Sequence, residues 1–275
     1  MKVSIITATY NSAQTLADTL ASLEAQTYAD IEYIVIDGAS KDSTLDVVKQ
    51  NSTKVTRIIS EPDKGIYDAL NKGIAAATGD VVGFLHSDDL LAYPEAIADV
   101  VAEFAATQCQ AVYGDLEYVA KTDTTKVIRL WKSGAYTKQK LHFGWMPPHP
   151  TFYMRRELYE KLGSFDLNFR IAADYDSLLR YLWRNDVSLS YVPKVLTKMR
   201  VGGASNRSLS NIIKKTGEDI RAIKKNGLFW PTVVLFKNLL DYHRDSASFS
   251  NRCGIGAVRI PALAKSVTIH SRLNR

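Results

Sequence analysis

The stretch Gly79-Asp80-Val81-Val82-Gly83-Phe84-Leu85-His86-Ser87-Asp88-Asp89 decides the fold that this sequence predicts. Its apolar run, Val81–Leu85, follows a turn and ends in a polar cluster, a pattern typical of a strand buried on both faces. In open α/β sheets, ligands bind beyond the carboxyl ends of the strands. Because Mg²⁺ and Mn²⁺ prefer oxygen ligands, often one or two carboxylates plus substrate phosphates, Asp88 and Asp89 are candidates for a metal and diphosphate site. The alternative is a turn in which Asp89 caps the next helix.

Three strand–helix units precede this stretch. Apolar strands are expected at Val3–Thr7, Ile31–Ile36 and Val55–Ile59, and each is followed by a polar loop and then a helical pattern. Such a succession predicts an α/β fold with a parallel, right-handed wound sheet flanked by helices. All the polar clusters should therefore lie on one edge of that sheet.

The second half of the sequence has a different pattern. A strand at Ala111–Tyr113 is followed by a hairpin, Tyr118–Ala120 with Val127–Leu130, which begins a small antiparallel part. Further on, a helix with a buried leucine face opens near Asp174.

Composition limits the class of protein. With 275 residues, 46% of them hydrophobic, the chain can bury a sizeable core. No apolar run reaches the roughly 18 residues of a membrane span, and Met1 leads straight into a strand without a signal peptide. Cys109 and Cys253 lie far apart without partners at metal spacing. We therefore expect a cytoplasmic protein with free thiols.

Charge is unevenly distributed along the chain. Residues 198–275 carry 15 Lys and Arg but 4 Asp and Glu, whereas residues 1–197 carry 20 against 25. A basic tail can contact nucleic acid, anionic lipid or a phosphate-rich substrate. Its apolar run Leu228–Leu240 is too short to span a bilayer, so it either lies at the inner membrane surface or packs on the preceding domain.

Four blocks of this sequence, in order, resemble glycosyltransferase family 2, which has the GT-A fold. The blocks are Val3–Asn11, Val35–Thr44, Glu61–Gly73 and Phe84–Asp89. The resemblance covers roughly residues 1–205 and is strongest to bacterial polysaccharide and lipopolysaccharide transferases. It implies a catalytic domain at 1–205, with a nucleotide-sugar half at 1–115 and an acceptor half at 116–205, and a basic helical extension at 206–275.

The resemblance also implies an activity. It indicates an inverting, hexosyltransferase-type enzyme that uses a nucleoside diphosphate sugar, with Mn²⁺ or Mg²⁺ as cofactor, in cell-surface polysaccharide synthesis. The acceptor would be a glycan or a polyprenyl-lipid-linked sugar, so contact of the extension with the membrane would be useful. A UDP-sugar is favoured because the family's base-binding acid, matched by Asp37, suits the imide N–H of uracil or thymine, although guanine is not excluded.

The family pattern assigns roles on the donor side. Thr7, Thr9 and Tyr10 match the block that lines the nucleoside; Lys64, Asp68 and Asn71 match the block near ribose and diphosphate; Asp88 matches the acid near the ribose, and Asp89 the metal ligand. His86 stands where many relatives have a carboxylate or amide, which leaves its contribution to the metal open.

On the acceptor side, Trp145 and His149 are candidates for a sugar-binding wall, because aromatic faces with a polar tip suit sugars. Inverting transfer also needs a base to take the proton of the acceptor hydroxyl. Asp174 matches the family's base, an acid opening the helix after a Gly-x-Phe-Asp loop, and Asp176 is its rival on another helix face. The loop Val201–Arg207 is expected to close over the diphosphate.

Two alternatives remain at this stage. A nucleotidyltransferase-like enzyme would need a Gly-rich, basic first loop, which Ala8–Asn11 lacks. A non-catalytic nucleotide or nucleic-acid binding protein could use the basic tail, but the tail lacks the aromatic and basic pattern of RNA-binding modules. We therefore expect no nucleic-acid partner.

Overall fold

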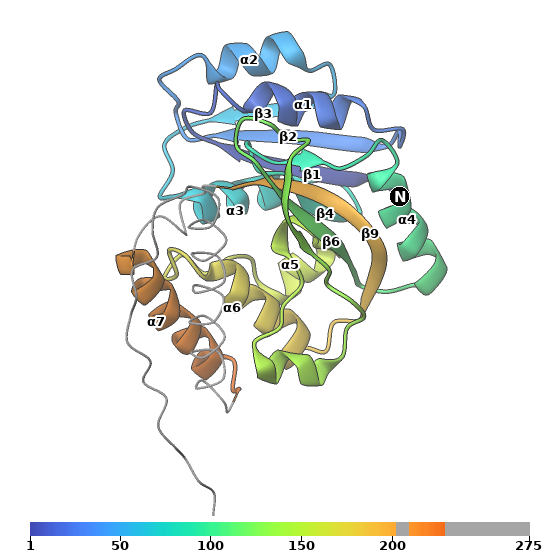
Figure 1. Ribbon diagram of the computed structural model, residues 1–275, viewed down its shortest axis with the longest axis vertical. Coiled ribbons are helices and arrows are strands. Elements are labelled where there is room, and N and C mark those ends of the chain that lie inside the picture. The colour runs from blue at the N-terminus through green and yellow to red at the C-terminus, as the bar shows by residue number, and fades with distance from the viewer. Residues whose placement is uncertain (202–208, 229–275) are drawn as a thin grey trace, which may run out of the picture. The chain divides into compact units, whose positions relative to one another are not determined.

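A computed structural model describes residues 1–201 and 209–228, with side chains from residue 213 onward in the second segment. Within these residues, nine strands form one sheet in the order β3-β2-β1-β4-β8-β6-β9-β5, and β7 pairs with β6 (Figure 1). The strands are β1 (Val3–Thr9), β2 (Ile31–Asp37), β3 (Val55–Ser60), β4 (Val81–Phe84), β5 (Leu90–Leu91), β6 (Ala111–Val119), β7 (Val127–Trp131), β8 (Tyr153–Arg155) and β9 (Leu189–Arg200).

The first half of the chain is the predicted parallel sheet. Strands β3, β2, β1 and β4 run parallel to one another, with helices between them, which confirms the expectation from the strand–helix units. The helices of this half are α1 (Leu16–Glu24), α2 (Thr44–Asn51), α3 (Ile66–Ala76) and α4 (Ala96–Thr107).

The second half adds antiparallel pairs. β8 pairs antiparallel with both β4 and β6, β7 with β6 as the predicted hairpin, and β5 with β9. β6 and β9 are parallel to each other. The remaining helical segments are the 3-10 turns Lys138–Phe143 and His149–Thr151, α5 (Arg156–Leu162), α6 (Ala173–Leu179), which continues as a π-helical turn at Arg180–Arg184, and α7 (Leu209–Lys225).

Each face of the sheet is covered by its own helices. Alternate residues of β1 point to opposite faces, so Ile5 belongs to the core that includes α1, α2 and α4, and Ile6 to the core that includes α3, α5, α6 and α7. Close contact with α3 depends on Gly73, where an added Cβ would lie 2.3 Å from Ile6 Cγ2. The predicted leucine face of α6 is confirmed, since Leu178 and Leu179 are fully buried.

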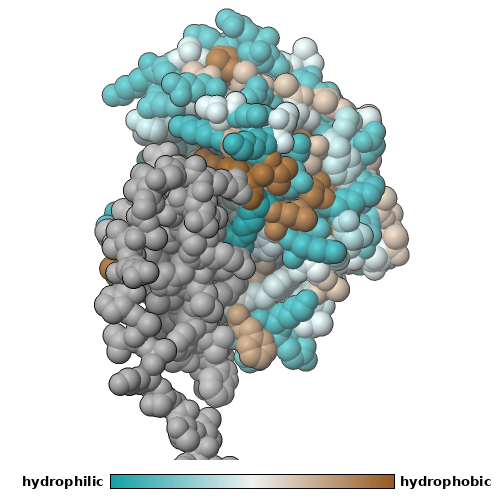
Figure 2. All heavy atoms as spheres, viewed as in Figure 1, coloured by the Kyte–Doolittle hydropathy of each residue, from teal (hydrophilic) through white to brown (hydrophobic). Residues whose placement is uncertain are grey.

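The surface is mainly polar. In the view of Figure 2, hydrophilic residues surround a compact apolar group near the middle of the described surface. The exposed apolar side chains of residues 116–201 are those of Val127, Leu130, Phe143 and Leu167. None of the described helices combines the length and the apolar character needed to cross a bilayer.

Candidate functional site

The carboxyl ends of three parallel strands form the floor of the candidate site. Thr9 at the end of β1 lies opposite Asp37 at the end of β2, and Asp37 lies opposite Ser60 at the end of β3. On the other side of β1, the Leu85 N–H after β4 donates to the Ile6 carbonyl at 3.1 Å. The polar clusters therefore share one edge of the sheet, as predicted.

Asp37 and Tyr10, the residues expected to receive the nucleoside, lie at the end of β2 and directly after β1. Asp37 is fully buried, and its carboxylate accepts hydrogen bonds from Ser40 N at 3.0 Å, from Ser60 Oγ at 2.6 Å and from Ser40 Oγ. Tyr10 is 59% exposed, so its ring is available for stacking. Gly38 packs closely against Asp63 beside this ring, because an added Cβ would lie 2.4 Å from Asp63 Oδ2 and 3.4 Å from the Tyr10 ring.

The two threonines of β1 differ in their use. Thr7 is fully buried, and its Oγ1 donates to the Leu85 carbonyl at 2.6 Å and lies 2.9 Å from Tyr33 Oη. Thr7 therefore holds β1 to its neighbours, with no polar atom left for a ligand. Thr9 Oγ1 is also buried but has no hydrogen-bond partner among the described residues. Such an orphaned hydroxyl at a strand end is a group that a ligand can satisfy.

The two loops that follow β1 and β2 hold each other. Asn11 Oδ1 accepts from Lys41 N at 2.9 Å, and Asn11 N donates to Ser40 Oγ at 2.8 Å. Asn11 and Ala39 have φ values of 50° and 60°, in the left-handed region. This conformation is energetically unfavourable for any residue that has a Cβ atom. Strain of this kind often lies at functional sites, where surrounding contacts maintain it.

Asp89 lies in the segment that follows β4. It is 1% exposed, its Oδ1 accepts from Arg200 N at 3.3 Å, and its Oδ2 is buried without a partner. Burial, with the charge of Asp88, raises the pKa of Asp89 well above its usual range, while the Arg200 N–H and guanidinium oppose the shift. Asp88 is half-buried, and its carbonyl accepts from Arg200 Nη1 at 2.9 Å.

Asp89 Oδ2 is the atom that best fits a divalent cation. A buried carboxylate oxygen without a donor suits a hard cation, whose charge would offset the desolvation. The described residues contain no group of three or more His, Cys, Asp or Glu side chains that could hold a metal ion. A metal at Asp89 would therefore need further oxygen ligands from water or from a phosphate-bearing substrate.

His86 and His149 form an apolar, uncharged wall next to these acids. The His149 ring stacks on Phe84 with centroids 5.1 Å apart, meets the Phe165 ring edge-on at 5.5 Å and lies 6.1 Å from the His86 ring. Burial, and then His86, lower the pKa of His149 to about 3. Burial also lowers the pKa of His86, against the charges of Asp88 and Asp174. The Nδ1 atom of His86 is buried without a partner.

Asp174 lies in the first turn of α6. It is half-buried, its Oδ1 accepts from Tyr175 N at 2.8 Å, and Tyr67 Oη lies 3.2 Å from the same oxygen. Burial raises the pKa of Asp174, offset in part by the Lys215 ammonium and by the Tyr175 and Tyr67 hydrogen bonds. Tyr67 also packs on Phe165, and Phe165 meets the His149 ring beside His86, so a chain of contacts joins Asp174 to the His86–Asp89 segment.

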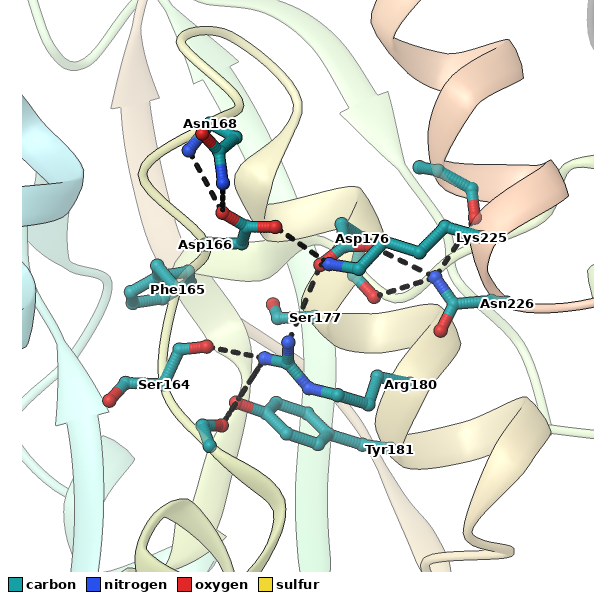
Figure 3. Close-up of polar contacts among 12 residues, drawn as sticks. Ser164, Phe165, Asp166, Asn168, Asp176, Ser177, Arg180, Tyr181, Lys225 and Asn226 are labelled. Atoms are coloured by element: carbon teal, nitrogen blue, oxygen red, sulfur yellow. Dashed lines mark hydrogen bonds and ion pairs between the residues drawn. The ribbon is translucent and has the colours of Figure 1, made fainter.

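The rival acid Asp176 serves the fold. It is fully buried, and its carboxylate contacts Lys225 Nζ at 2.9 Å, Asn226 Nδ2 at 3.0 Å and Arg180 Nη1 at 3.4 Å (Figure 3). Because Asp176 is fully buried and paired with these three donors, it is not accessible to a substrate.

The three residues of the central block differ in availability: Lys64 lies just before α3, and Asp68 and Asn71 lie in its first two turns. Lys64 is exposed, and its N–H donates to Asp68 Oδ2 at 3.0 Å. Asp68 also lies 3.8 Å from Lys72 Nζ. The Asn71 amide pairs with both backbone groups of Phe165, each at 2.9 Å. Lys64 is thus the member of this block that can reach an anionic ligand.

Trp145 packs among residues of the second half of the chain. Its Nε1 donates to the Ser133 carbonyl at 3.2 Å, and its ring lies against Tyr113 and Tyr136, each with centroids 5.7 Å away. None of these contacts links Trp145 to the Asp89 or Asp174 carboxylates. Its place in an acceptor wall stays a prediction.

Sequence reasoning missed three residues that hold the site. Arg200 connects Asp88 and Asp89 to the Lys121 carbonyl, Tyr67 contacts Asp174, and Glu218 contacts the segment before α6. Arg200 ends the last predicted strand directly before the expected loop, which is the one signal that could have suggested it. Residues 202–207 of that loop lie outside the described part of the chain.

Comparison with known proteins identifies the family. The family model described as "Glycosyl transferase family 2" matches residues 4–163. A PGL/p-HBAD biosynthesis glycosyltransferase of Mycobacterium bovis is 30% identical over 241 residues, which is 84% of this chain and 91% of the relative.

Solved structures share the fold. S. aureus TarS 1–349 in complex with UDP-GlcNAc matches with a TM-score of 0.62 at 19% identity, over 92% of this chain and 75% of that one. This chain spans 45% of a longer TarS chain. The mannosyltransferase PcManGT from Pyrobaculum calidifontis, in complex with GDP-Man and Mn²⁺, matches with a TM-score of 0.62 at 20% identity, over 94% and 76%. These neighbours are GT-A enzymes, and together with the family match they show that this chain belongs to glycosyltransferase family 2.

Proposed function

We propose that this protein is an inverting glycosyltransferase that moves a hexosyl group from a nucleoside diphosphate sugar to a glycan or lipid-linked acceptor, with Mn²⁺ or Mg²⁺. The observation that carries the proposal is a pair of carboxylates in unlike environments at one sheet edge. Asp89 has a buried, unpartnered oxygen, and Asp174 is a half-buried acid with a raised pKa. Unlike environments are how one site supports two roles for the same type of group.

Asp89 would hold the metal ion, together with oxygens of the donor diphosphate. When bound, a divalent cation supplies positive charge that stabilises the departing nucleoside diphosphate. Lys64, exposed before α3, can add a second positive charge at the phosphates. Thr9 Oγ1, which has no hydrogen-bond partner at the end of β1, can form a hydrogen bond with the nucleotide sugar.

Asp174 would act as the base. The acceptor oxygen forms a bond to the anomeric carbon from the face opposite the diphosphate, the bond from that carbon to the phosphate oxygen breaks, and the acceptor proton passes to Asp174. The raised pKa of Asp174 increases the affinity of its carboxylate for the proton, and the hydrogen bond from Tyr175 N holds Asp174 Oδ1 in place. The apolar ring cluster around His149, which includes Phe84 and Phe165, would help to exclude water.

Tyr10 and Asp37 would receive the nucleoside. Tyr10 offers an exposed ring, and Asp37 already accepts three hydrogen bonds from serines, so a base N–H would compete with or add to them. We favour UDP as the nucleotide, because the Asp37 carboxylate can accept a hydrogen bond from the imide N–H of uracil. The TarS neighbour was solved with UDP-GlcNAc and PcManGT with GDP-Man, so both nucleotides belong in the test.

The acceptor class and the membrane contact are the finer part of the proposal. One relative is named for PGL/p-HBAD biosynthesis, and for this chain we propose a glycan or lipid-linked acceptor. The described part of the extension, α7, exposes Ile213, Lys214, Arg221 and Lys224, a composition suited to an anionic membrane surface. The run Leu228–Leu240 lies outside the described residues beyond its first position.

The test is thermal unfolding of the wild type and of Asp89→Asn with UDP, GDP or dTDP, each with and without Mn²⁺. A nucleotide at 100 times its dissociation constant adds about 2.7 kcal/mol of stability. We expect a metal-dependent shift with UDP in the wild type and none in Asp89→Asn. Asp174→Asn should keep that shift and lose transfer, because only the proton acceptor has gone.

Two results would contradict the proposal. An Asp174→Asn variant with wild-type transfer would show that Asp174 is not the base, and an absence of any nucleotide shift in the wild type would argue against a nucleotide-sugar donor. Family membership already disfavours the nucleotidyltransferase-like and non-catalytic alternatives.

A further inference from the structure

The segment directly before Asp174 is held by a carboxylate from a distant part of the chain. Glu218 on α7 accepts hydrogen bonds from three consecutive N–H groups, those of Arg170, Ile171 and Ala172. The distances to Glu218 Oε2 are 3.1, 2.8 and 2.9 Å, and Arg170 N is also 3.1 Å from Oε1. Since α6 begins at Ala173, one side chain of α7 supplies the acceptors for the backbone that leads into it.

A second, independent anchor ties the end of α7 to α6. Lys225 Nζ lies 2.9 Å from Asp176 Oδ2 and 2.8 Å from Asp166 Oδ2, and Asn226 Nδ2 donates to Asp176 Oδ1 at 3.0 Å. Figure 3 shows Asp166 and Asp176 converging on the Lys225 ammonium, with Asn226 beside it and Arg180 on the other side. This anchor ties the end of α7 to α6 through residues other than Glu218.

The Asp174 carboxylate depends on that backbone for its position. Its Oδ1 accepts from the N–H of the next residue, Tyr175, so the side chain is tied to its own turn. Tyr67 Oη lies 2.8 Å from the Ile171 carbonyl and 3.2 Å from Asp174 Oδ1, so its single proton serves one oxygen at a time. Because Glu218 holds the N–H groups of Ile171 and its neighbours, any movement of that segment moves Asp174 and the Tyr67 contact together.

We propose that α7 is a working part of the active site and that Glu218 is a positioning residue for Asp174. The inference rests on the proposed role of Asp174 as the base. Glu218 touches no substrate in this role. It fixes the backbone from which Asp174 projects, and a base displaced by about 1 Å can lose on the order of 100-fold in rate.

The test compares Glu218→Gln and Glu218→Ala in the full-length protein with Glu157→Ala. Glu157 is an exposed glutamate on α5 whose contact is Lys161, at 3.3 Å, so it controls for loss of a surface carboxylate. Gln at 218 can keep one oxygen at the position of Oε2, whereas Ala keeps none. The measurements are kcat, the nucleotide dissociation constant in Mn²⁺, and amide hydrogen exchange at 170–172.

We expect kcat to fall at least tenfold in Glu218→Ala, to fall less in Glu218→Gln, and to stay unchanged in Glu157→Ala. Nucleotide affinity should stay within twofold in all three, because Asp89, Tyr10 and Asp37 are untouched. Amide exchange at 170–172 should accelerate in the same order as kcat falls. Rescue by Gln separates positioning from general loss of stability, which would lower nucleotide affinity as well.

Wild-type kcat in both Glu218 variants, alongside an inactive Asp174→Asn variant, would overturn this inference and leave the proposed function intact. Unchanged exchange at 170–172 in Glu218→Ala would overturn it as well. Full transfer by Asp174→Asn would instead defeat the proposed base, and with it the reason for positioning Asp174.

Discussion

A buried carboxylate oxygen without a partner destabilises the protein that carries it, and Asp89 Oδ2 is such an atom. Its cost, on the order of 1–3 kcal/mol, persists only if the residue does something that offsets it. The metal-binding role proposed for Asp89 explains why the oxygen is left unpaired. Stability lost at a functional residue and recovered on ligand binding is a common arrangement in enzymes.

We therefore predict that Asp89→Asn raises the free energy of unfolding of the metal-free protein by about 1 kcal/mol, because a neutral amide costs less to bury than a carboxylate. The measurement is urea unfolding in EDTA and then in Mn²⁺ with nucleotide. The order of stabilities should reverse in the second condition, where only the wild type gains from the ligand. A variant less stable than the wild type in EDTA would show that Asp89 supports the fold through its Arg200 contact.

A second residue-level prediction concerns the pH dependence of transfer. Asp174 must be deprotonated to accept a proton, so activity is lost as pH falls through its pKa. The charged and titratable groups facing Asp174 are Tyr67, His86, Lys215 and Glu218. Of these, the Lys215 ammonium lowers the pKa of Asp174, so Lys215→Gln should move the acid limb of the kcat profile to higher pH.

Lys215→Arg keeps the charge and should leave that limb in place. The exposed neighbour Lys214 provides the matched control, and Lys214→Gln should leave the profile unchanged. The check is kcat against pH for the four proteins. If the acid limb of the kcat profile lies at the same pH in Lys215→Gln as in the wild type, a group other than Asp174 titrates in that limb.

The sequence identifies Asp174 and Asp176 as candidate bases, but it does not show that one of them is buried and paired. Both are acids in the first turn of one helix, and local pattern treats them alike. The difference comes from Lys225 and Asn226, about 50 residues further along the chain, which bury and pair Asp176. Long-range partners of this kind leave no local signal.

At the scale of elements, α3 connects the first half of the chain to the loop before α6. Its residue Asn71 was expected near ribose and diphosphate, but its amide is paired with the N–H and the carbonyl of Phe165. Phe165 packs against His149 and Tyr67, so this pair fixes the ring wall and the loop before α6.

We predict that Asn71→Ala acts through stability rather than through nucleotide affinity. The variant leaves the partly buried backbone groups of Phe165 unpaired, which should cost about 1–3 kcal/mol. The urea midpoint should fall with an unchanged m-value, and the nucleotide dissociation constant should stay within twofold. Asn51→Ala is the control, since Asn51 is exposed and its amide bonds only within its own helix α2. A large loss of nucleotide affinity with little change in midpoint would instead support the ribose or diphosphate role.

The elements that sequence predicted best are those with local signals. β1, β2 and β3 follow apolar runs with polar ends, and their bounds agree with expectation to within two residues. The insertion of β8 between β4 and β6, and the pairing of β9 with both β5 and β6, could not be predicted. A three-residue strand such as Tyr153–Arg155 owes its conformation to neighbouring strands rather than to its own pattern.

At the scale of the whole molecule, charge counting describes the basic extension incompletely. Lys215 pairs with Asp219 at 2.7 Å, and Lys225 pairs with Asp166 and Asp176. These cations pair inside the protein, and the exposed Arg221 also donates to the Asn168 carbonyl at 2.6 Å, whereas Lys214 and Lys224 are exposed. The helix that sequence placed beyond the catalytic domain therefore has one face directed at α6 and another that is available to a partner.

The strength of that attachment can be measured by a double-mutant cycle with Asp176→Asn, Lys225→Met and the double variant. Asp176 is fully buried, so losing Lys225 leaves its charge supported only by Arg180 and Asn226. We expect a coupling energy of about 1–3 kcal/mol from urea unfolding, below the value for a fully buried pair because the Lys225 side chain is 36% exposed. The exposed pair Glu157–Lys161 is the control and should give about 0.3–0.5 kcal/mol. A coupling energy no larger than the control would mean that α7 is held mainly by its apolar contacts and by Glu218, and that the ion cluster of Figure 3 adds little to the docking of the helix.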